Sequence, residues 1–116
     1  MNQNSSDCLF CSIVSGKLPA EIVYQDDQCI AFNDIHPQAP VHVLIVPKRH
    51  VSTLNDVTGE DVVVGTLAAR AVRIAKDMGV DESGYRILMN CNSEGGQTVY
   101  HIHMHLLGGK QLGALC

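Results

Sequence analysis

Residues 95–109 read Gly-Gly-Gln-Thr-Val-Tyr-His-Ile-His-Met-His-Leu-Leu-Gly-Gly, with three histidines alternating with apolar residues between two glycine pairs. If this stretch forms a strand, successive side chains point to opposite faces, so His101, His103 and His105 share one face. Neighbouring imidazoles would then lie about 6.5–7 Å apart. The apolar residues of the other face can enter a core, and these are Ile102, Met104 and Leu106. Half of the chain's six histidines lie here, which predicts a sheet face with a chemical role.

The composition is that of one folded domain. The chain has 116 residues, of which 46% are hydrophobic and 17% charged, enough for a single core. The net charge of −4 comes without a run of lysine or arginine, and tryptophan is absent. These features give no support to nucleic-acid binding or to attraction to an anionic membrane.

The sequence shows neither a secretion signal nor a disulfide pattern, and this fits a cytoplasmic protein. Residues 1–7 are polar and lack the apolar core of a signal peptide. The longest apolar run, residues 43–46, is far too short to cross a bilayer. The five cysteines are odd in number and scattered, which does not indicate a disulfide framework. We therefore expect a cytoplasmic protein.

The rest of the chain predicts an α+β domain with a five-stranded antiparallel sheet. We expect a short helix capped by Asp7 and a long helix that opens near Thr58 and Asp61 and stops at Gly79. The expected helices and strands cover residues 8–15, 21–24, 29–32, 42–46, about 58–78, 85–90 and the triad stretch. Two prolines place residues 33–40 in a loop. We expect tails at residues 1–7 and 114–116 around a domain at 8–113.

Taken alone, the three histidines favour a catalytic or ligand-binding site over a metal site or a structural strand. Neutral imidazole is nucleophilic near pH 7 and can attack a phosphorus centre. Charge that develops on the phosphoryl oxygens needs nearby donors. Backbone N–H groups around Gly96, Gln97 and Thr98 could provide them, with His105 as a further donor. The Thr98 hydroxyl and the Gln97 amide could act on a leaving group or on water.

Residues 101–107 also match the signature of the histidine triad (HIT) superfamily, in which three histidines alternate with apolar residues. Residues 95–100 resemble its branch of histidine triad nucleotide-binding proteins, which are purine nucleoside phosphoramidases. The resemblance continues at residues 32–42 and 84–90, so it spans residues 8–113. It implies a HIT fold in which two copies pair into a ten-stranded sheet as a homodimer.

The resemblance also implies roles for individual residues. His103 would be the nucleophile, His105 would contact the phosphate and His101 would support the site. Asp34 would bind the ribose hydroxyls, while Phe32 and Ile35 would form the walls of the purine pocket or be part of the core. The remaining expected contacts, to the phosphate and the leaving group, are Asn90, Gly96, Gln97 and Thr98. His42 matches a further histidine beside the triad.

A second motif is Cys8-Leu9-Phe10-Cys11. Its spacing is that of a zinc half-site or of a redox pair, and a closed zinc site needs two more ligands. The resemblance to the zinc-bearing bacterial HIT proteins implies that His50 and His101 complete the site. If His101 binds zinc, it cannot give a proton to the leaving group. Cys29, Cys91 and Cys116 have no such pattern.

Together with the nucleophilic chemistry of the triad, the resemblance implies a hydrolase that cleaves adenosine 5′-phosphoramidates or related adenylates to AMP through a nucleotidyl-histidine. Two other functions fit the same motifs. One is hydrolysis of dinucleoside polyphosphates, against which the Gly-Gly-Gln-Thr-Val-Tyr segment argues. The other is nucleotide binding with a regulatory role and incidental turnover. The chain ends soon after Gly109, whereas HIT proteins often carry a longer tail that influences substrate choice.

Overall fold

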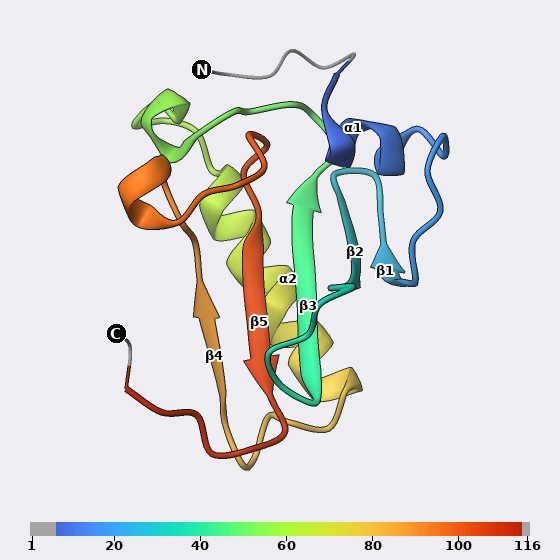
Figure 1. The fold of residues 1–116 in the computed structure, drawn as a ribbon, viewed down its shortest axis with the longest axis vertical. Coiled ribbons are helices and arrows are strands. Elements are labelled where there is room, and N and C mark those ends of the chain that lie inside the picture. The colour runs from blue at the N-terminus through green and yellow to red at the C-terminus, as the bar shows by residue number, and fades with distance from the viewer. Residues whose placement is uncertain (1–6, 115–116) are drawn as a thin grey trace.

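The protein is a five-stranded antiparallel sheet with one long and one short helix, as a computed structural model of residues 7–114 shows (Figure 1). The strand order is β1-β2-β3-β5-β4. The strands are β1 (Ile22–Gln25), β2 (Cys29–Asn33), β3 (Val41–Pro47), β4 (Tyr85–Leu88) and β5 (Met104–Gly108), and the helices are α1 (Leu9–Val14) and α2 (Val63–Asp77). The predicted α+β fold is confirmed. Of the two expected tails, residues 1–6, 115 and 116 lie outside the described residues.

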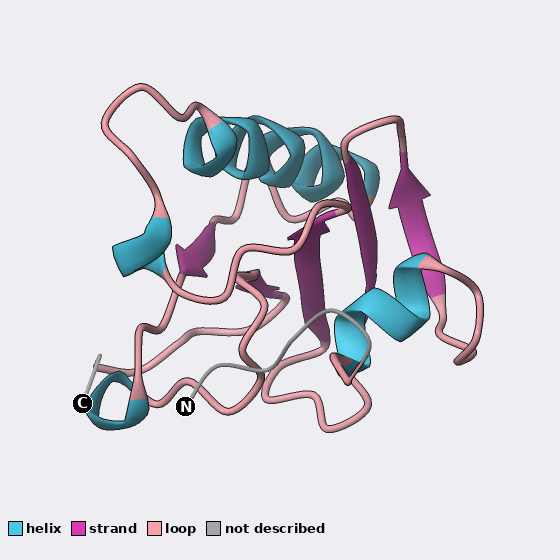
Figure 2. Ribbon diagram, turned by 90° about the horizontal axis from the view of Figure 1, so that it is seen from above, coloured by secondary structure: helices cyan, strands magenta, loops and turns pink. Residues whose placement is uncertain are grey.

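One face of the sheet packs against α2 and forms the main core (Figure 2). The helix contributes Leu67, Ala71 and Ile74, which are at most 2% exposed. The sheet side of this core includes Val43, Ile45, Ile102, Met104 and Leu106. The prediction that the apolar residues between the triad histidines enter a core is therefore confirmed. Because each fully buried aliphatic side chain contributes about 1.5–3 kcal/mol, this face anchors β3, β5 and the segment just before β5.

The long helix begins later than its sequence suggests. Thr58 and Asp61 were expected to open it, but α2 starts at Val63. The Asp61 carboxylate accepts a hydrogen bond from the Val63 N–H at 3.0 Å, so it satisfies a free donor of the first turn. Asp61 also pairs with Arg49. At the other end Gly79 has φ of 76°, which confirms the predicted left-handed stop.

The short helix α1 covers the opposite face of the sheet, beyond β2 and β3 (Figure 2). Phe10 and Ile13 are buried there in a second cluster that includes Phe32 and Leu44. The helix cap differs from the prediction. Cys8, and not Asp7, is the N-cap residue, and its Sγ atom accepts from the Cys11 N–H at 3.4 Å.

The triad stretch is only partly a strand. β5 starts at Met104, so His101 and His103 precede it, and the prediction of one strand through all three histidines is wrong. The segment before β5 pairs with the loop after β3 instead, since the Ile102 N–H donates to the Val51 carbonyl at 2.7 Å. The His103 and His105 ring centroids lie 5.1 Å apart, closer than regular strand spacing predicts. Similarly, β4 ends at Leu88, so residues 89 and 90 continue outside the sheet.

Among residues 7–114, no helix has the length and apolar character needed to cross a membrane.

Candidate active site and metal centre

The sheet face that is turned away from α2 carries the candidate site. The strand register aligns Phe32 of β2 with Leu44 of β3, and Leu44 with His105 of β5. Directly paired residues of neighbouring strands share one face. Phe32 and His105 therefore lie on the same face, with Leu44 between them.

His103 is held as a neutral imidazole with a defined tautomer. Its Nδ1 atom lies 2.8 Å from the His101 carbonyl oxygen. Because a carbonyl can only accept a hydrogen bond, Nδ1 carries the proton and Nε2 keeps a free lone pair. Burial lowers the pKa of His103 below its ordinary value, so the ring is neutral at pH 7. The side chain is only 8% exposed. His103 thus has the protonation state that a nucleophile needs.

His105 is held in the opposite tautomer by a chain of hydrogen bonds. The Gln38 N–H donates to His42 Nδ1 at 3.0 Å, which places the proton of a neutral His42 on Nε2. His42 Nε2 lies 3.0 Å from His105 Nδ1, which therefore accepts. The proton of His105 is then on Nε2, where it can be donated to an anion. Burial, with smaller effects of His103 and His42, lowers the pKa of His105 to about 4.

Asp34 joins this chain, since its Oδ2 atom lies 3.4 Å from His42 Nε2. By spacing alone Asp34, His42 and His105 could hold a metal ion. However, the proton on His42 Nε2 occupies the lone pair that a metal would need. The arrangement is therefore a hydrogen-bonded relay and not a metal site.

A cavity of about 360 Å³ lies in front of His103 and His105. One wall is apolar and includes Leu9, Phe10 and Ile13 of α1 together with Phe32 of β2. The polar lining consists of Asn33, Asp34, His36, Thr98, His103 and His105. Six of the site residues expected from the sequence line this one cavity, namely Phe32, Asp34, Ile35, Thr98, His103 and His105.

Phe32 and Ile35 were open to a core interpretation, and they differ. Ile35 is 86% exposed, so it belongs to the rim of the cavity and not to the core. Phe32 is 4% exposed and belongs both to the cavity wall and to the cluster under α1.

The part of the cavity wall that α1 forms was not predicted from the sequence. The positions of Leu9, Phe10 and Ile13 on one side of the Cys-x-x-Cys helix were the signal that could have revealed it.

The polar groups of the glycine turn before the triad form hydrogen bonds with neighbouring backbone. The backbone N–H groups of Gly96 and Gln97 donate to the carbonyls of Ser93 and Asn92. The Gln97 side chain is 5% exposed, accepts from the Asn92 N–H and donates to two backbone carbonyls. The Gly96 and Gln97 N–H groups were expected to face a phosphate, and the Gln97 amide was expected to act on a leaving group or on water. In the structure these groups bond within the turn and to the neighbouring backbone instead.

Thr98 and Asn90 are placed differently by this turn. Thr98 is exposed and lines the cavity, so its hydroxyl is the group of the turn that can reach a ligand. Asn90 donates from Nδ2 to the Gly95 carbonyl at 2.7 Å and lies outside the cavity lining. Gly96 has φ of 87°, and a Cβ atom at this position would lie 3.7 Å from Asn90 Nδ2. Asn90 therefore binds the turn through its side-chain amide and does not face the cavity.

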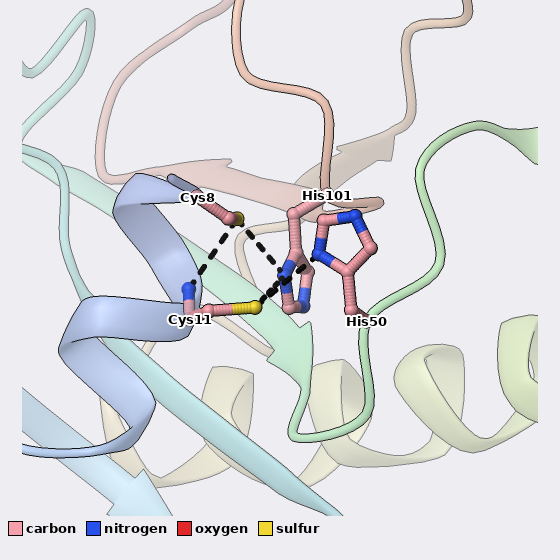
Figure 3. Close-up of side chains that lie close together, drawn as sticks. All are labelled: Cys8, Cys11, His50 and His101. Carbon is pink, nitrogen blue, oxygen red and sulfur yellow. Dashed lines mark hydrogen bonds between the residues drawn. The ribbon is translucent and has the colours of Figure 1, made fainter. Parts of the chain in front are cut away.

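The second cluster joins the N-terminus of α1 to the triad (Figure 3). Cys8 Sγ lies 3.4 Å from His101 Nδ1, and Cys11 Sγ lies 3.2 Å from His50 Nδ1 and 3.5 Å from His101 Nδ1. The four candidate ligand atoms all lie within 4.8 Å of one another. The predicted set of Cys8, Cys11, His50 and His101 is thus brought together and could hold a metal ion.

The tautomer of His101 suits metal binding. Its Nε2 atom lies 2.7 Å from the Pro47 carbonyl oxygen, so Nε2 is protonated and the lone pair of Nδ1 points toward the two sulfurs. Burial lowers the pKa of His101 to about 4. Burial and the neighbouring Cys8 raise the pKa of the Cys11 thiol to about 11. A bound cation would remove this penalty on the thiolate. His50 resembles His101 in this respect, because its Nε2 atom, the ring nitrogen that does not face the sulfurs, lies 3.0 Å from the Ser52 hydroxyl.

Residues 15–112 match the family model of the HIT domain. The chain belongs to the HIT family. It is 48% identical over 112 residues to the purine nucleoside phosphoramidase of Escherichia coli strain K12, with 96% of this chain and 94% of that protein covered. These findings confirm the family that the triad signature predicted.

Solved HIT structures agree in fold. A HIT family hydrolase from Legionella pneumophila superposes with a TM-score of 0.90 at 50% identity, covering 92% of this chain and 96% of that one. A zinc-bound histidine triad family protein from Mycobacterium smegmatis superposes with a TM-score of 0.77 at 34% identity, covering 92% and 78% of the two chains.

Proposed function

We propose that this HIT protein hydrolyses purine nucleoside 5′-phosphoramidates, above all those of adenosine, and releases the nucleoside monophosphate. The observation that carries the proposal is the hydrogen bond from His103 Nδ1 to the His101 carbonyl. It leaves Nε2 of a buried, neutral imidazole unprotonated at the wall of a cavity. The relationship to a named purine nucleoside phosphoramidase at 48% identity supports this substrate class.

The cavity has complementary ends for such a substrate. The apolar wall of Phe10, Ile13 and Phe32 suits a purine ring. Asp34 lines the same cavity and is the acceptor for ribose hydroxyls. Its Oδ1 atom already accepts from the His36 N–H at 2.8 Å, which fixes the orientation of the carboxylate. The α-phosphate would then lie between His103, His105 and Thr98.

The reaction proceeds in two displacements. His103 Nε2 attacks the α-phosphorus, the new N–P bond forms, and the bond to the leaving amine breaks. The His105 Nε2–H donates to a non-bridging phosphoryl oxygen and stabilises the charge that develops there. The amine leaves after gaining a proton from water or through the Thr98 hydroxyl. In the second step water attacks the nucleotidyl-histidine, releases AMP and restores neutral His103.

We further infer that the ion at Cys8, Cys11, His50 and His101 is zinc. Two thiolates and two imidazoles form a common donor set of closed structural zinc sites, and a zinc-bound relative shares the fold. When bound, zinc would cross-link α1 to the loop after β3 and to the triad segment. His101 is then a ligand and takes no part in proton transfer.

A homodimer with a ten-stranded sheet is the assembly that we propose. β4 is an edge strand with one unpaired side, and an exposed edge can pair with a second copy. Ile87 of β4 and Val72 of α2 are exposed, at 38% and 47%. Sedimentation equilibrium would give the dimer mass, and an Ile87→Lys variant is expected to shift it toward the monomer. Wild-type protein that remains monomeric at micromolar concentration would exclude this assembly.

The function is tested by a turnover screen with product analysis. Adenosine and guanosine 5′-phosphoramidates, an acyl adenylate and a diadenosine polyphosphate are compared under one condition. The proposal predicts the highest kcat/KM for a phosphoramidate and release of AMP. It also predicts that His103→Ala loses at least about 10⁴-fold in kcat, as expected when a nucleophile is removed. Preference for the dinucleotide, or tight AMP binding without turnover, would support the two alternative functions instead.

A further inference from the structure

The short helix α1 belongs to two sites at once. Cys8 and Cys11 provide the sulfur atoms of the metal cluster. Phe10, between them, lines the nucleotide cavity, and its ring centroid lies 6.0 Å from that of the candidate ligand His101. Phe10 is 4% exposed, and its ring centroid lies 5.0 Å from that of His103 and 5.5 Å from that of Phe32. A shift of α1 would therefore change the metal cluster and the cavity wall together.

His101 makes a second link between the sites. Its side chain directs Nδ1 toward the cysteine sulfurs (Figure 3). Its backbone carbonyl accepts the hydrogen bond from His103 Nδ1 that selects the tautomer of the nucleophile. The position of this one residue thus affects both a metal-ligand bond and the orientation of His103.

The helix needs such an anchor because it is short. α1 has only six residues, well below the roughly 12–15 residues that give an isolated helix even marginal stability in water. Its buried anchors are Cys8, Phe10 and Ile13, which pack on the sheet. Leu9, on the cavity side, is 44% exposed. The metal-ligand bonds of Cys8, the N-cap residue of α1, and of Cys11 would hold the first turn of this helix.

We propose that metal binding at Cys8, Cys11, His50 and His101 and nucleotide binding in the cavity are positively coupled through α1 and His101. The metal-loaded protein holds the cavity wall and His103 in the nucleotide-binding arrangement. The metal-free protein must order α1 when the nucleotide binds, so it binds more weakly. This coupling rests on the proposed function, because it requires that the cavity accepts a nucleotide.

The coupling has a quantitative signature. If zinc raises the affinity for AMP by some factor, AMP must raise the affinity for zinc by the same factor. Typical coupling between sites lies at about 5–150-fold. We expect a factor of at least about 5-fold, since an entire wall of the cavity depends on α1.

The test measures both affinities and does not depend on turnover. Calorimetry gives the dissociation constant of AMP for the zinc-loaded protein and for the zinc-free protein kept reduced. Competition with a chromophoric chelator gives the zinc affinity with and without saturating AMP. The proposal predicts weaker AMP binding without zinc, and equal factors in the two experiments. Equal AMP affinity in both forms would overturn the coupling while leaving the proposed function intact. Absence of AMP binding to either form would overturn both.

Two matched variants distinguish an effect on the coupling from the direct effect of losing an aromatic ring in the cavity wall. Phe10→Leu and Phe32→Leu each remove one ring from the same cavity wall, but only Phe10 lies between the two cysteines. Both are expected to weaken AMP binding. Only Phe10→Leu is expected to reduce the AMP-induced gain in zinc affinity, by several-fold relative to wild type. If circular dichroism shows that zinc-free protein unfolds, this comparison alone decides, and equal gains in the two variants would overturn the coupling.

Discussion

At the scale of single residues, backbone groups decide what each histidine can do. The His101 carbonyl fixes the proton of His103 on Nδ1, and the Gln38 N–H fixes that of His42 on Nε2. Through His42 the same constraint reaches His105. One histidine thus exposes a lone pair and another exposes a proton. Nucleophilic attack and stabilisation of the phosphate need this difference.

This relay predicts that His42 positions His105 without touching the substrate. His42→Ala should leave His105 free to adopt either tautomer, and a misplaced catalytic group costs about 10²-fold in rate. We expect kcat to fall by that order while KM changes little. His42→Gln should recover part of the rate, because its amide can accept from Gln38 and donate to His105. Loss confined to KM, or no recovery with glutamine, would contradict the positioning role.

The buried histidines also predict how stability depends on pH. Burial lowers the pKa of His42 below its ordinary value and that of His105 to about 4. The unfolded chain, with histidine pKa near 6.5, binds more protons between about pH 6.5 and 4. The free energy of unfolding should therefore fall as pH decreases through that window. Urea denaturation at several pH values measures this slope. The slope should be smaller in His105→Gln, and an equal slope would contradict the assignment.

At the scale of elements, the sequence pattern predicted what local periodicity controls. Alternation placed Ile102, Met104 and Leu106 in the core, and spacings of three and four residues identified α2. Such local patterns could not predict contacts between segments that are far apart in sequence. The strand begins at Met104 because Ile102 bonds to the loop at Val51, which no local rule reveals.

In the candidate site, too, local motifs could be predicted and contacts between distant segments could not. The triad and the Cys-x-x-Cys pair are local motifs and could be read directly from the sequence. His50 could be assigned to the metal cluster only through a family resemblance, since it is 39 residues from Cys11. The cavity wall of α1 was missed because it depends on packing across the sheet. The hydrogen bonds within the glycine turn depend on the positive φ of 61° at Asn92, a conformation that residues other than glycine adopt only in a minority of cases, so the sequence offered little sign of them.

The β1–β2 hairpin offers a prediction at this scale. Asp26 accepts hydrogen bonds from the Tyr24 hydroxyl, from Arg70 of α2 and from the backbone N–H groups of Gln28 and Cys29. These bonds, that of Tyr24 foremost, hold the pKa of Asp26 well below its usual range. Its contribution to stability is thus present above about pH 4 and is lost as pH falls further.

Replacement of this carboxylate tests the hairpin contact. Asp26→Asn should lower the free energy of unfolding at pH 7 by about 1–3 kcal/mol, because Arg70 loses a charged partner. The difference from wild type should shrink below pH 4. Asp27→Asn, on the same exposed turn, is the control and is expected to change stability by less than about 0.5 kcal/mol. A difference that stays constant from pH 7 down to pH 2 would contradict the account.

At the scale of the whole molecule, the candidate metal ligands Cys8, Cys11, His50 and His101 come from three segments that are far apart in sequence. A bound metal ion would join α1, the loop after β3 and the segment before β5, and these segments surround the candidate site. A ligand that binds only the folded chain stabilises it by an amount that grows with its concentration over its dissociation constant.

Removal of the metal should therefore destabilise the protein. Cys8→Ser/Cys11→Ser is expected to lose zinc and to have a lower Tm than wild type, by several degrees or more. Cys91→Ser, a thiol outside the cluster, is the control and should retain zinc and nearly the wild-type Tm. Metal analysis and calorimetric scans measure both quantities. Wild-type protein that contains no zinc after growth with zinc, or variants that keep it, would contradict the metal assignment.

In the proposed mechanism, His103 Nε2 forms a covalent bond to the nucleotide. The most direct test is rapid quenching under alkaline conditions, where a phosphoramidate bond survives, during turnover of an adenosine 5′-phosphoramidate. Peptide mass spectrometry then locates the modification. We predict one adenylyl group on the peptide that contains His103, at the histidine itself, and none in His103→Ala. Adenylylation at another residue, or turnover without any adenylylated peptide, would contradict the mechanism.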